Sequence, residues 1–239
     1  MTTLYSFCPQ DECADGQGPY AGLIQTADGN LYGTTYYGGS HNYGTVFQLA
    51  PGGALTTLHR FCLSACADGK YPYAGLVQAT NGELYGTTSE GGANLSGTIF
   101  KITPTGTFTT LYSFCSQPGC PDGSSPYGGL MQSTDGDLYG TTFYGGANKY
   151  GTIFRLSVGL GPFVATRPTA GPVGAAVIIL GTDLTGTTSV SFNGAAAAFE
   201  IVSNSEITTT VPAGATSGKV QVVIPSGTLS SNMPFRVQP

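Results

Sequence analysis

The sequence contains one segment three times, and this repeat limits the possible folds more than any other feature. The motifs LYGTT and GT(V/I)F each occur three times, beginning at Leu31, Leu84 and Leu138 and at Gly44, Gly97 and Gly151. Successive copies of either motif are 53 and then 54 residues apart. A constant period of this length indicates a repeated supersecondary unit, so the three copies are expected to share one local structure.

Each copy is predicted to hold four short antiparallel strands. The second copy begins with GLVQA and ELYGTT around an Asn-Gly pair at 81–82, and Asp-Gly pairs at 28–29 and 135–136 take this place in the other copies. Both dipeptides favour a two-residue type I′ hairpin turn, in which both central residues have positive φ. GTIFKIT and TFTTLYSF follow as strands, with a turn at 104–106 between them. Four antiparallel strands are the size of one propeller blade.

The repeats begin with a fourth strand and end with a third strand, so one strand at each end of the repeat region lacks its expected neighbours. The fourth strand reads TTLYSF, TTLHRF and TTLYSF at residues 2–7, 56–61 and 109–114, and strands one to three follow each of these segments. The third set ends at 151–156, where a glycine-containing linker begins instead of a fourth strand. The N-terminal segment is therefore a fourth strand without its own first three, and the last copy lacks the fourth strand that it needs.

These two ends predict strand donation between molecules. The expected donor residues are Thr2, Thr3, Leu4, Tyr5, Ser6 and Phe7. The expected acceptor residues are Gly151, Thr152, Ile153, Phe154, Arg155 and Leu156. Donation would cover a bare strand edge, and the head-to-tail contact gives a ring if the rotation closes and a fibre if it does not. We expect a fibre ahead of a ring. The alternatives are closure of one chain into a threefold β fold, such as a trefoil or prism, and a fragment of a longer array.

The character of the chain changes near Gly161. Residues 163–239 contain about seven strand-like runs separated by Gly, Pro, Asn and Ser turns, which is typical of an immunoglobulin-like sandwich. The prediction is an all-β chain in three parts. A repeat domain at 1–157 holds three four-stranded, propeller-blade-like units, a linker spans 158–162, and the sandwich spans 163–239.

Both parts resemble known families. The stretch GGANxxGTIFKITPTGTFTTLYSF followed by PDGxxPYGGLxQSTDGxLYGTT, with its equivalents over residues 2–156, is similar to the Gloeobacter/Verrucomicrobia-type (GloVer) repeat. The runs VIILG and VSFNG between Pro168 and Val220 resemble an IPT/TIG immunoglobulin-like domain. The first resemblance implies a bacterial surface or secreted protein of propeller-like fold with no assigned activity, in arrays often longer than three copies. The second implies a spacer on a bacterial surface or a part of a DNA-binding factor.

Charge and hydropathy argue against several partners. The net charge is −5 with only eight Lys and Arg, which gives no electrostatic footprint for nucleic acid or an anionic membrane. Within the sandwich segment the net charge is zero, because three basic residues (Arg167, Lys219 and Arg236) balance three acidic ones (Asp183, Glu200 and Glu206). No apolar run reaches the roughly 20 residues that span a bilayer. Met1 leads directly into repeat sequence, so a secreted form is expected to have lost its leader.

Six cysteines form one close pair in each copy. They are Cys8 and Cys13, Cys62 and Cys66, and Cys115 and Cys120. Each pair lies between the fourth strand and an Asp-Gly dipeptide, where a local disulfide is expected. A metal site is the alternative, but it favours four ligands at C-x₂-C spacing. Disulfides indicate an oxidising compartment, so we expect a secreted, extracellular or cell-surface protein of a bacterium.

No catalytic constellation is recognisable. His41 and His59 lie at different positions of the repeat, and His59 replaces a tyrosine of the other copies. The recurring acids Asp15, Asp68 and Asp122 each precede glycine, so they are expected to accept hydrogen bonds from turn N–H groups. One carboxylate per loop is few for calcium, which takes six to eight oxygens. We therefore expect no enzyme, no cofactor and no metal.

Aromatic residues gather on the glycine-rich loop that follows LYGTT. They are Tyr36, Tyr37 and Tyr43 in the first copy and Phe143, Tyr144 and Tyr150 in the third. Such residues stack on sugars, anchor interfaces or fold back onto their own unit. The middle copy lacks them, which favours an interface of the outer copies. We expect a structural surface protein that assembles with copies of itself, with a glycan-binding, lectin-like adhesion module as the alternative.

Overall fold

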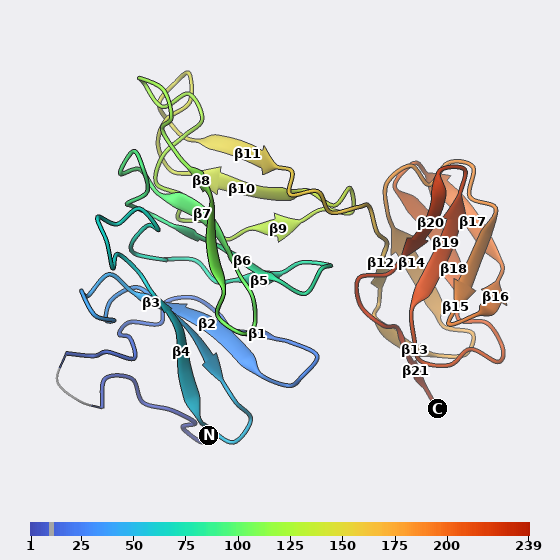
Figure 1. The fold of residues 1–239 in the computed structure, drawn as a ribbon. Coiled ribbons are helices and arrows are strands. Elements are labelled where there is room, and N and C mark those ends of the chain that lie inside the picture. The colour runs from blue at the N-terminus through green and yellow to red at the C-terminus, as the bar shows by residue number, and fades with distance from the viewer. Residues whose placement is uncertain (10–11) are drawn as a thin grey trace. The chain divides into compact units, whose positions relative to one another are not determined.

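The computed structural model describes residues 1–9 and 12–239, which form strands, turns and loops without any helix. This confirms the prediction of an all-β chain. The chain divides into two compact units. The first comprises residues 1–132 and 138–156, and the second comprises residues 133–137 and 157–239. Figure 1 shows the first unit in blue to yellow and the second mainly in orange and red.

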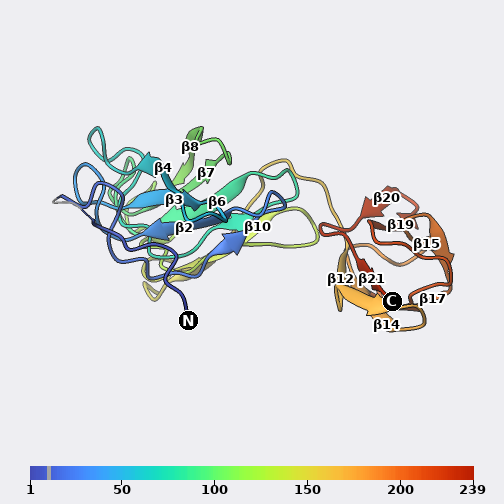
Figure 2. The same ribbon diagram turned by 90° about the horizontal axis from the view of Figure 1, so that it is seen from below.

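Each repeat forms its own antiparallel sheet, and we name them sheet 1, sheet 2 and sheet 3. Sheet 1 has the order β1 (Ile24–Gln25), β2 (Leu31–Thr35), β3 (Thr45–Leu49), β4 (Leu55–Arg60). Sheet 2 has the order β5 (Val77–Gln78), β6 (Leu84–Thr88), β7 (Thr98–Ile102), β8 (Phe108–Ser113). Sheet 3 has three strands, β9 (Met131–Gln132), β10 (Leu138–Thr142) and β11 (Thr152–Leu156). Figures 1 and 2 show the three sheets following one another in chain order.

The hairpin turns inside the sheets are real, but the prediction of type I′ turns was wrong. Between β1 and β2 the amide of Gly29 donates to the Thr26 carbonyl at 3.0 Å, and the amide of Thr26 donates to the Asn30 carbonyl at 3.1 Å. Gly29 has a φ of 83°, whereas Asp28 is not among the residues with positive φ. This is the three-residue loop, a type I turn followed by a left-handed glycine. The additional residue leaves the aspartate in the ordinary right-handed region.

The LYGTT motif recurs because each of its small residues has a packing role. Gly86 of β6 lies opposite Phe100 of β7, and a Cβ on Gly86 would lie 2.5 Å from the buried Phe100 ring. The hydroxyls of Thr88 and Thr98 are 2.8 Å apart across the same two strands. Sheets 1 and 3 repeat both arrangements. The motif therefore sets the spacing of the second and third strands in each sheet.

Sheet 3 ends at β11, whereas sheets 1 and 2 continue to a fourth strand. β4 and β8 are strands because they pair with β3 and β7 along their length. Residues 2–7, expected to be the same kind of strand, form no strand in the single chain. Among the described residues, no third strand lies beside them to pair with.

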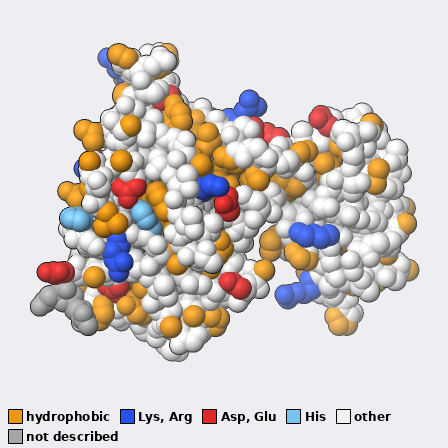
Figure 3. All heavy atoms as spheres, viewed as in Figure 1, with side chains coloured by type: hydrophobic (Ala, Val, Ile, Leu, Met, Phe, Trp, Pro, Cys, Tyr) orange, Lys and Arg blue, Asp and Glu red, His pale blue; other side chains and the backbone are white. Residues whose placement is uncertain are grey.

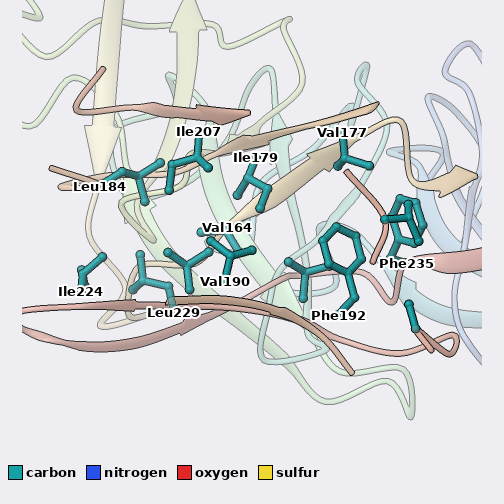
Figure 4. Close-up of a cluster of buried hydrophobic side chains, with 14 residues drawn as sticks. Val164, Val177, Ile179, Leu184, Val190, Phe192, Ile207, Ile224, Leu229 and Phe235 are labelled. Atoms are coloured by element: carbon teal, nitrogen blue, oxygen red, sulfur yellow. The ribbon is translucent and has the colours of Figure 1, made fainter. Parts of the chain in front are cut away.

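The second unit is a β-sandwich of the predicted immunoglobulin-like kind. One sheet has the order β12 (Ala165–Arg167), β14 (Ala176–Leu180), β18 (Glu206–Thr210), β17 (Phe199–Ser203), and the other has β16 (Ala195–Ala197), β15 (Ser189–Phe192), β19 (Val220–Ile224), β20 (Gly227–Ser230). A parallel pair, β13 (Ala170–Pro172) and β21 (Arg236–Gln238), lies beside them. Figure 4 shows Val177, Ile179 and Ile207 of the first sheet meeting Val190 and Phe192 of the second in one buried core.

Candidate functional site

Neighbouring repeat sheets meet through the end of each fourth strand. Phe61, directly after β4, packs against Phe100 of sheet 2 with ring centroids 5.4 Å apart. Phe114, directly after β8, packs against Phe154 of sheet 3 at 5.1 Å. We call the interface between two neighbouring repeat sheets a joint. The two contacts use equivalent residues, so both joints have the same construction at the fourth strand.

An aspartate of the following loop binds the same fourth strand. The Nε2 atom of His59 lies 2.9 Å from an Asp68 carboxylate oxygen, and the Tyr112 hydroxyl donates to Asp122 at 2.7 Å. The amide of Cys62 also donates to Asp68, at 3.0 Å, as predicted for these turn carboxylates. Each aspartate therefore ties a fourth strand to the loop that begins the next sheet.

Hydrogen bonding shifts the pKa values of Tyr112 and Asp122, the pair that ties β8 of sheet 2 to the loop before sheet 3. Burial acts to raise the pKa of Asp122, but hydrogen bonds from the Tyr112 hydroxyl and from Ser116 outweigh it and leave that pKa below its usual value. Burial and the hydrogen bond to Asp122 raise the pKa of Tyr112. The aspartate is therefore ionised at neutral pH and acts as an acceptor.

The N-terminal segment makes the contacts of a fourth strand with sheet 1. The rings of Phe7 and Phe47 are 5.0 Å apart, and the Tyr5 hydroxyl donates to Asp15 at 2.7 Å. A Cβ added to Gly53 would lie 3.3 Å from the Leu4 carbonyl oxygen. At the next joint, a Cβ added to Gly106 would lie 3.4 Å from the carbonyl oxygen of Leu58, the equivalent of Leu4. The predicted donor residues are thus already placed against sheet 1 as β4 is placed against sheet 2.

The other side of each joint is formed by the chain that leads into the first strand. The hydroxyl of Thr34 donates to the Ala74 carbonyl at 3.0 Å, and the equivalent Thr87 donates to Gly128 at 3.3 Å. Thr34 and Thr87 are buried, whereas Thr141, which has their place in sheet 3, is exposed. Sheet 3 therefore presents a joint that nothing in the described chain occupies.

Exposure of apolar residues distinguishes sheet 3 from the other two. Ile153 of β11 is 82% exposed, whereas its equivalents Val46 and Ile99 are 0% and 1% exposed. Beside it lies a hollow of about 340 Å³ lined by residues of β11 and the end of β8, among them Tyr112, Phe114, Phe154 and Leu156. The predicted acceptor strand is thus an open edge with a space next to it.

Sheet 1 has an exposed apolar face at the other end of the repeat unit. Leu23 is 50% exposed, whereas its equivalents Leu76 and Leu130 are 6% and 8% exposed. A second hollow of about 320 Å³ lies there, with Leu4, Phe7, Ala21, Leu23 and Leu55 among its lining residues. The repeat unit therefore has two unlike apolar ends, and we call them the β11 face and the Leu23 face.

The six cysteines form the three local disulfides that were predicted. The bonded pairs are Cys8 with Cys13, Cys62 with Cys66, and Cys115 with Cys120. Each disulfide closes a short loop two residues before the aspartate of a joint. Among the described residues, no group of three His, Cys, Asp or Glu side chains is placed to hold a metal ion.

The predicted aromatic residues fall into two groups that other tyrosines connect. Tyr36 stacks on Tyr71 with centroids 4.9 Å apart and also contacts Tyr20 and Tyr37. Tyr43 contacts Tyr71 as well, and the Lys70 ammonium lies over both rings. In sheet 3, Phe143 contacts Tyr144 at 4.5 Å. Tyr150, by contrast, is 93% exposed.

Tyr20, Tyr73 and Tyr127 join these groups into one band, which we call the tyrosine ladder. The centroids of Tyr20 and Tyr73, and those of Tyr73 and Tyr127, are 5.6 Å apart, and Tyr127 contacts Phe143 at 5.7 Å. All three ladder tyrosines are exposed. Sequence reasoning missed them, although a Pro-Tyr pair recurs once per repeat and marks the position.

Charged side chains are few and scattered on the face drawn in Figure 3, with acidic and basic residues interspersed. The ion pair of Lys70 and Glu90 and that of Lys101 and Glu83 each neutralise their charges locally. Within the described part of the chain, no helix has the length and apolar character needed to cross a membrane.

Comparison with known proteins identifies families for both units. The model of the Gloeobacter/Verrucomicrobia repeat matches residues 1–197, and the IPT/TIG domain model matches residues 164–237. Both models cover β12 to β16, which the structure places in the sandwich. The comparison with curated proteins found no match.

Two solved structures share a weak likeness. One is a fungal alcohol oxidase of the AA5 family in complex with copper, with 15% identity and a TM-score of 0.38 over 90% of this chain and 53% of that one. The other is a putative 6-phosphogluconolactonase from Bacteroides fragilis, with 17% identity and a TM-score of 0.31 over 86% of this chain and 64% of that one. The chain thus spans less than two thirds of either protein. Likeness at these scores says nothing about its activity.

Proposed function

The chain belongs to the Gloeobacter/Verrucomicrobia repeat family, and from this premise we propose that it is a non-enzymatic structural protein outside the bacterial cell that binds copies of itself. The two matched families and the three disulfides fit an extracellular β-rich module. In the proposal, residues 2–7 of one molecule pair with β11 of another and complete its sheet 3.

The observation that carries the proposal is the match between the two open faces. Residues equivalent to Ile153 and Leu23 are buried wherever a joint exists, so the exposed pair marks the two halves of a missing joint. The donor segment need not leave its place on sheet 1, because β4 contacts sheet 2 while it pairs with β3. Main-chain hydrogen bonds along β11 would supply affinity, and the apolar hollow would supply specificity.

The substitution Ile153→Lys tests this proposal. It places a charge where the equivalent side chains are buried in a joint, so self-association should be lost. The mass of the particle, measured by size-exclusion chromatography with light scattering, should fall to that of one chain. Val202→Lys makes a comparable change on an exposed strand of the second unit and should leave the mass as in the wild type. An Ile153→Lys chain that keeps the wild-type mass would show that the β11 face is not the contact.

A glycan-binding module is the second candidate, and the tyrosine ladder is the observation that favours it. Exposed aromatic rings in a row suit the apolar faces of sugar rings, while their hydroxyls suit sugar hydroxyls. The ion pairing of Lys70 with Glu90 beside the ladder leaves little net charge there, so the expected ligand is a neutral polysaccharide.

Affinity electrophoresis through gels containing xylan, mannan or β-glucan tests this second function. Retardation by one of these polysaccharides should be lost on Tyr73→Ala, which breaks the ladder at its centre. Leu95→Ala removes an exposed apolar side chain outside the ladder and should leave the retardation unchanged. Equal migration of the wild type and Tyr73→Ala in every gel would reject the ladder as a sugar site.

A further inference from the structure

We infer that two copies of the chain close reciprocally into one six-bladed ring, in which each copy supplies the fourth strand of the other's sheet 3. This inference rests on the proposed function and adds to it the number of copies and the residue register. A ring of two copies makes two equivalent head-to-tail contacts, so no β11 face and no Leu23 face remains open.

The two joints within one chain have the same construction, and a constant joint produces a constant rotation. The amide of Tyr71 donates to the Tyr43 carbonyl at 2.8 Å, and the amide of Ser125 donates to the Ser96 carbonyl at 2.9 Å. These bonds repeat at equivalent residues, as do the threonine bonds and the phenylalanine contacts described above. A stack of sheets with one rotation per joint bends steadily in one direction.

The bend arises because the two sides of a joint differ in thickness. Next to the first strands, a Cβ on Gly75 would lie only 3.1 Å from the Gly22 carbonyl, so the backbones nearly touch. At the fourth strands, the rings of His59, Phe61 and Phe108 stand between the sheets, and the closest pair stacks at 3.8 Å. Glycine on one side and stacked rings on the other make the joint between sheets 1 and 2 wedge-shaped. Repeated wedges form a ring with the first strands inside.

The number of copies follows from the number of sheets. Complete propellers contain four to eight blades. Residues 1–156 supply three sheets, which are too few to close. Two copies supply six and three copies supply nine, so two is the number of copies that falls within the range.

Sheet 2 gives the register of the donated strand. There Thr98 lies opposite Ser113 and Lys101 lies opposite Thr109. Transferred to sheet 3, this register places Thr152 of one copy opposite Ser6 of the other, and Arg155 opposite Thr2. Met1 then takes the place of Phe108, whose ring packs on the preceding fourth strand. Its side chain would enter the hollow beside β11.

The remaining contacts of a joint are also available. The exposed hydroxyl of Thr141 would donate to Ala21 of the second copy, as Thr34 donates to Ala74. The carbonyl of Tyr150 would accept from the amide of Gly18 of the second copy, as Tyr43 accepts from Tyr71. The threonine and backbone hydrogen bonds described at the joints thus have partners in the closed pair.

A cysteine pair placed at the inferred register tests the ring. The full chain carrying Ser6→Cys and Thr152→Cys is oxidised mildly and run on a denaturing gel without reductant. Facing cross-strand residues lie close enough for a disulfide, so a covalent dimer without higher species is expected. Ser6→Cys alone and Thr152→Cys alone should remain monomeric on the gel. The pair Thr2→Cys with Arg155→Cys repeats the test at a second position, in case the first pair disturbs folding.

The other outcomes separate the ring from the proposed function. A ladder of trimers and larger species would overturn the six-bladed ring while supporting strand donation in an open chain. A cross-link confined to the monomer would overturn both, because it would mean closure within one chain. Absence of any cross-link with both cysteine pairs would overturn donation at β11 itself.

Discussion

One aspartate in each repeat controls how a fourth strand is held against the next sheet. Its place before glycine predicts hydrogen bonds to turn amides, and the structure confirms this at Asp68. The second partner, a tyrosine or histidine of the fourth strand ten or nine residues earlier, was not predicted. A strand residue and a loop residue meet here only because a disulfide loop folds the chain back. Spacing alone does not reveal that reversal.

The substitution Asp122→Asn tests this role at the residue scale. It removes charge-assisted hydrogen bonds from Tyr112 and Ser116, so the free energy of unfolding should fall by about 1–2 kcal/mol at neutral pH. Because the pKa of Asp122 is lower in the folded protein than in the unfolded chain, this contribution is fully present above the unfolded-state pKa and is lost as the pH falls through the folded-state pKa. Urea titrations should therefore show the two proteins converging in acid. Glu200→Gln, an exposed acid of the second unit, should match the wild type at neutral pH.

Among the elements, the LYGTT strand shows how closely the repeat sheets are packed. Its glycine leaves room for the ring of the neighbouring phenylalanine, so Gly86→Ala should cost about 1–3 kcal/mol of unfolding free energy through overpacking against Phe100. Gly52→Ala is the matched control, because no atom lies within 4 Å of a Cβ there, and its effect should stay within about 0.5 kcal/mol. Thermal and urea unfolding of the two variants give the comparison. Equal stability would mean that Phe100 can move away.

Strands and their order could be predicted from the repeat, whereas their turns and partners could not. Period-two alternation and recurring glycine pairs located the hairpins correctly. The turn type was wrong because Asp-Gly also suits a type I turn with one more loop residue, and the dipeptide does not distinguish the two. Tyr20, Tyr73 and Tyr127 were missed for another reason. They lie 53 or 54 residues apart in sequence, and only the stacking of the sheets brings their rings together.

At the scale of the whole molecule, the proposed self-association uses two open faces of the repeat unit. The phase of the repeat predicted a spare strand at the N-terminus and a bare strand edge at residues 151–156. In the structure, Ile153 of that edge and Leu23 at the opposite end of the repeat unit are both exposed. From the sequence we expected a fibre ahead of a ring. The sequence alone does not reveal the rotation between neighbouring sheets. The wedge of glycine and aromatic rings at the joint between sheets 1 and 2 favours closure instead.

Sedimentation equilibrium of the intact chain over a wide concentration range tests whether two copies close into one particle. Strand donation that closes on two copies predicts a single species of twice the 24.4 kDa of one chain, with no growth to larger particles as the concentration rises. A mass of one chain at every concentration would contradict the account, because the β11 face and the Leu23 face would then have no partner.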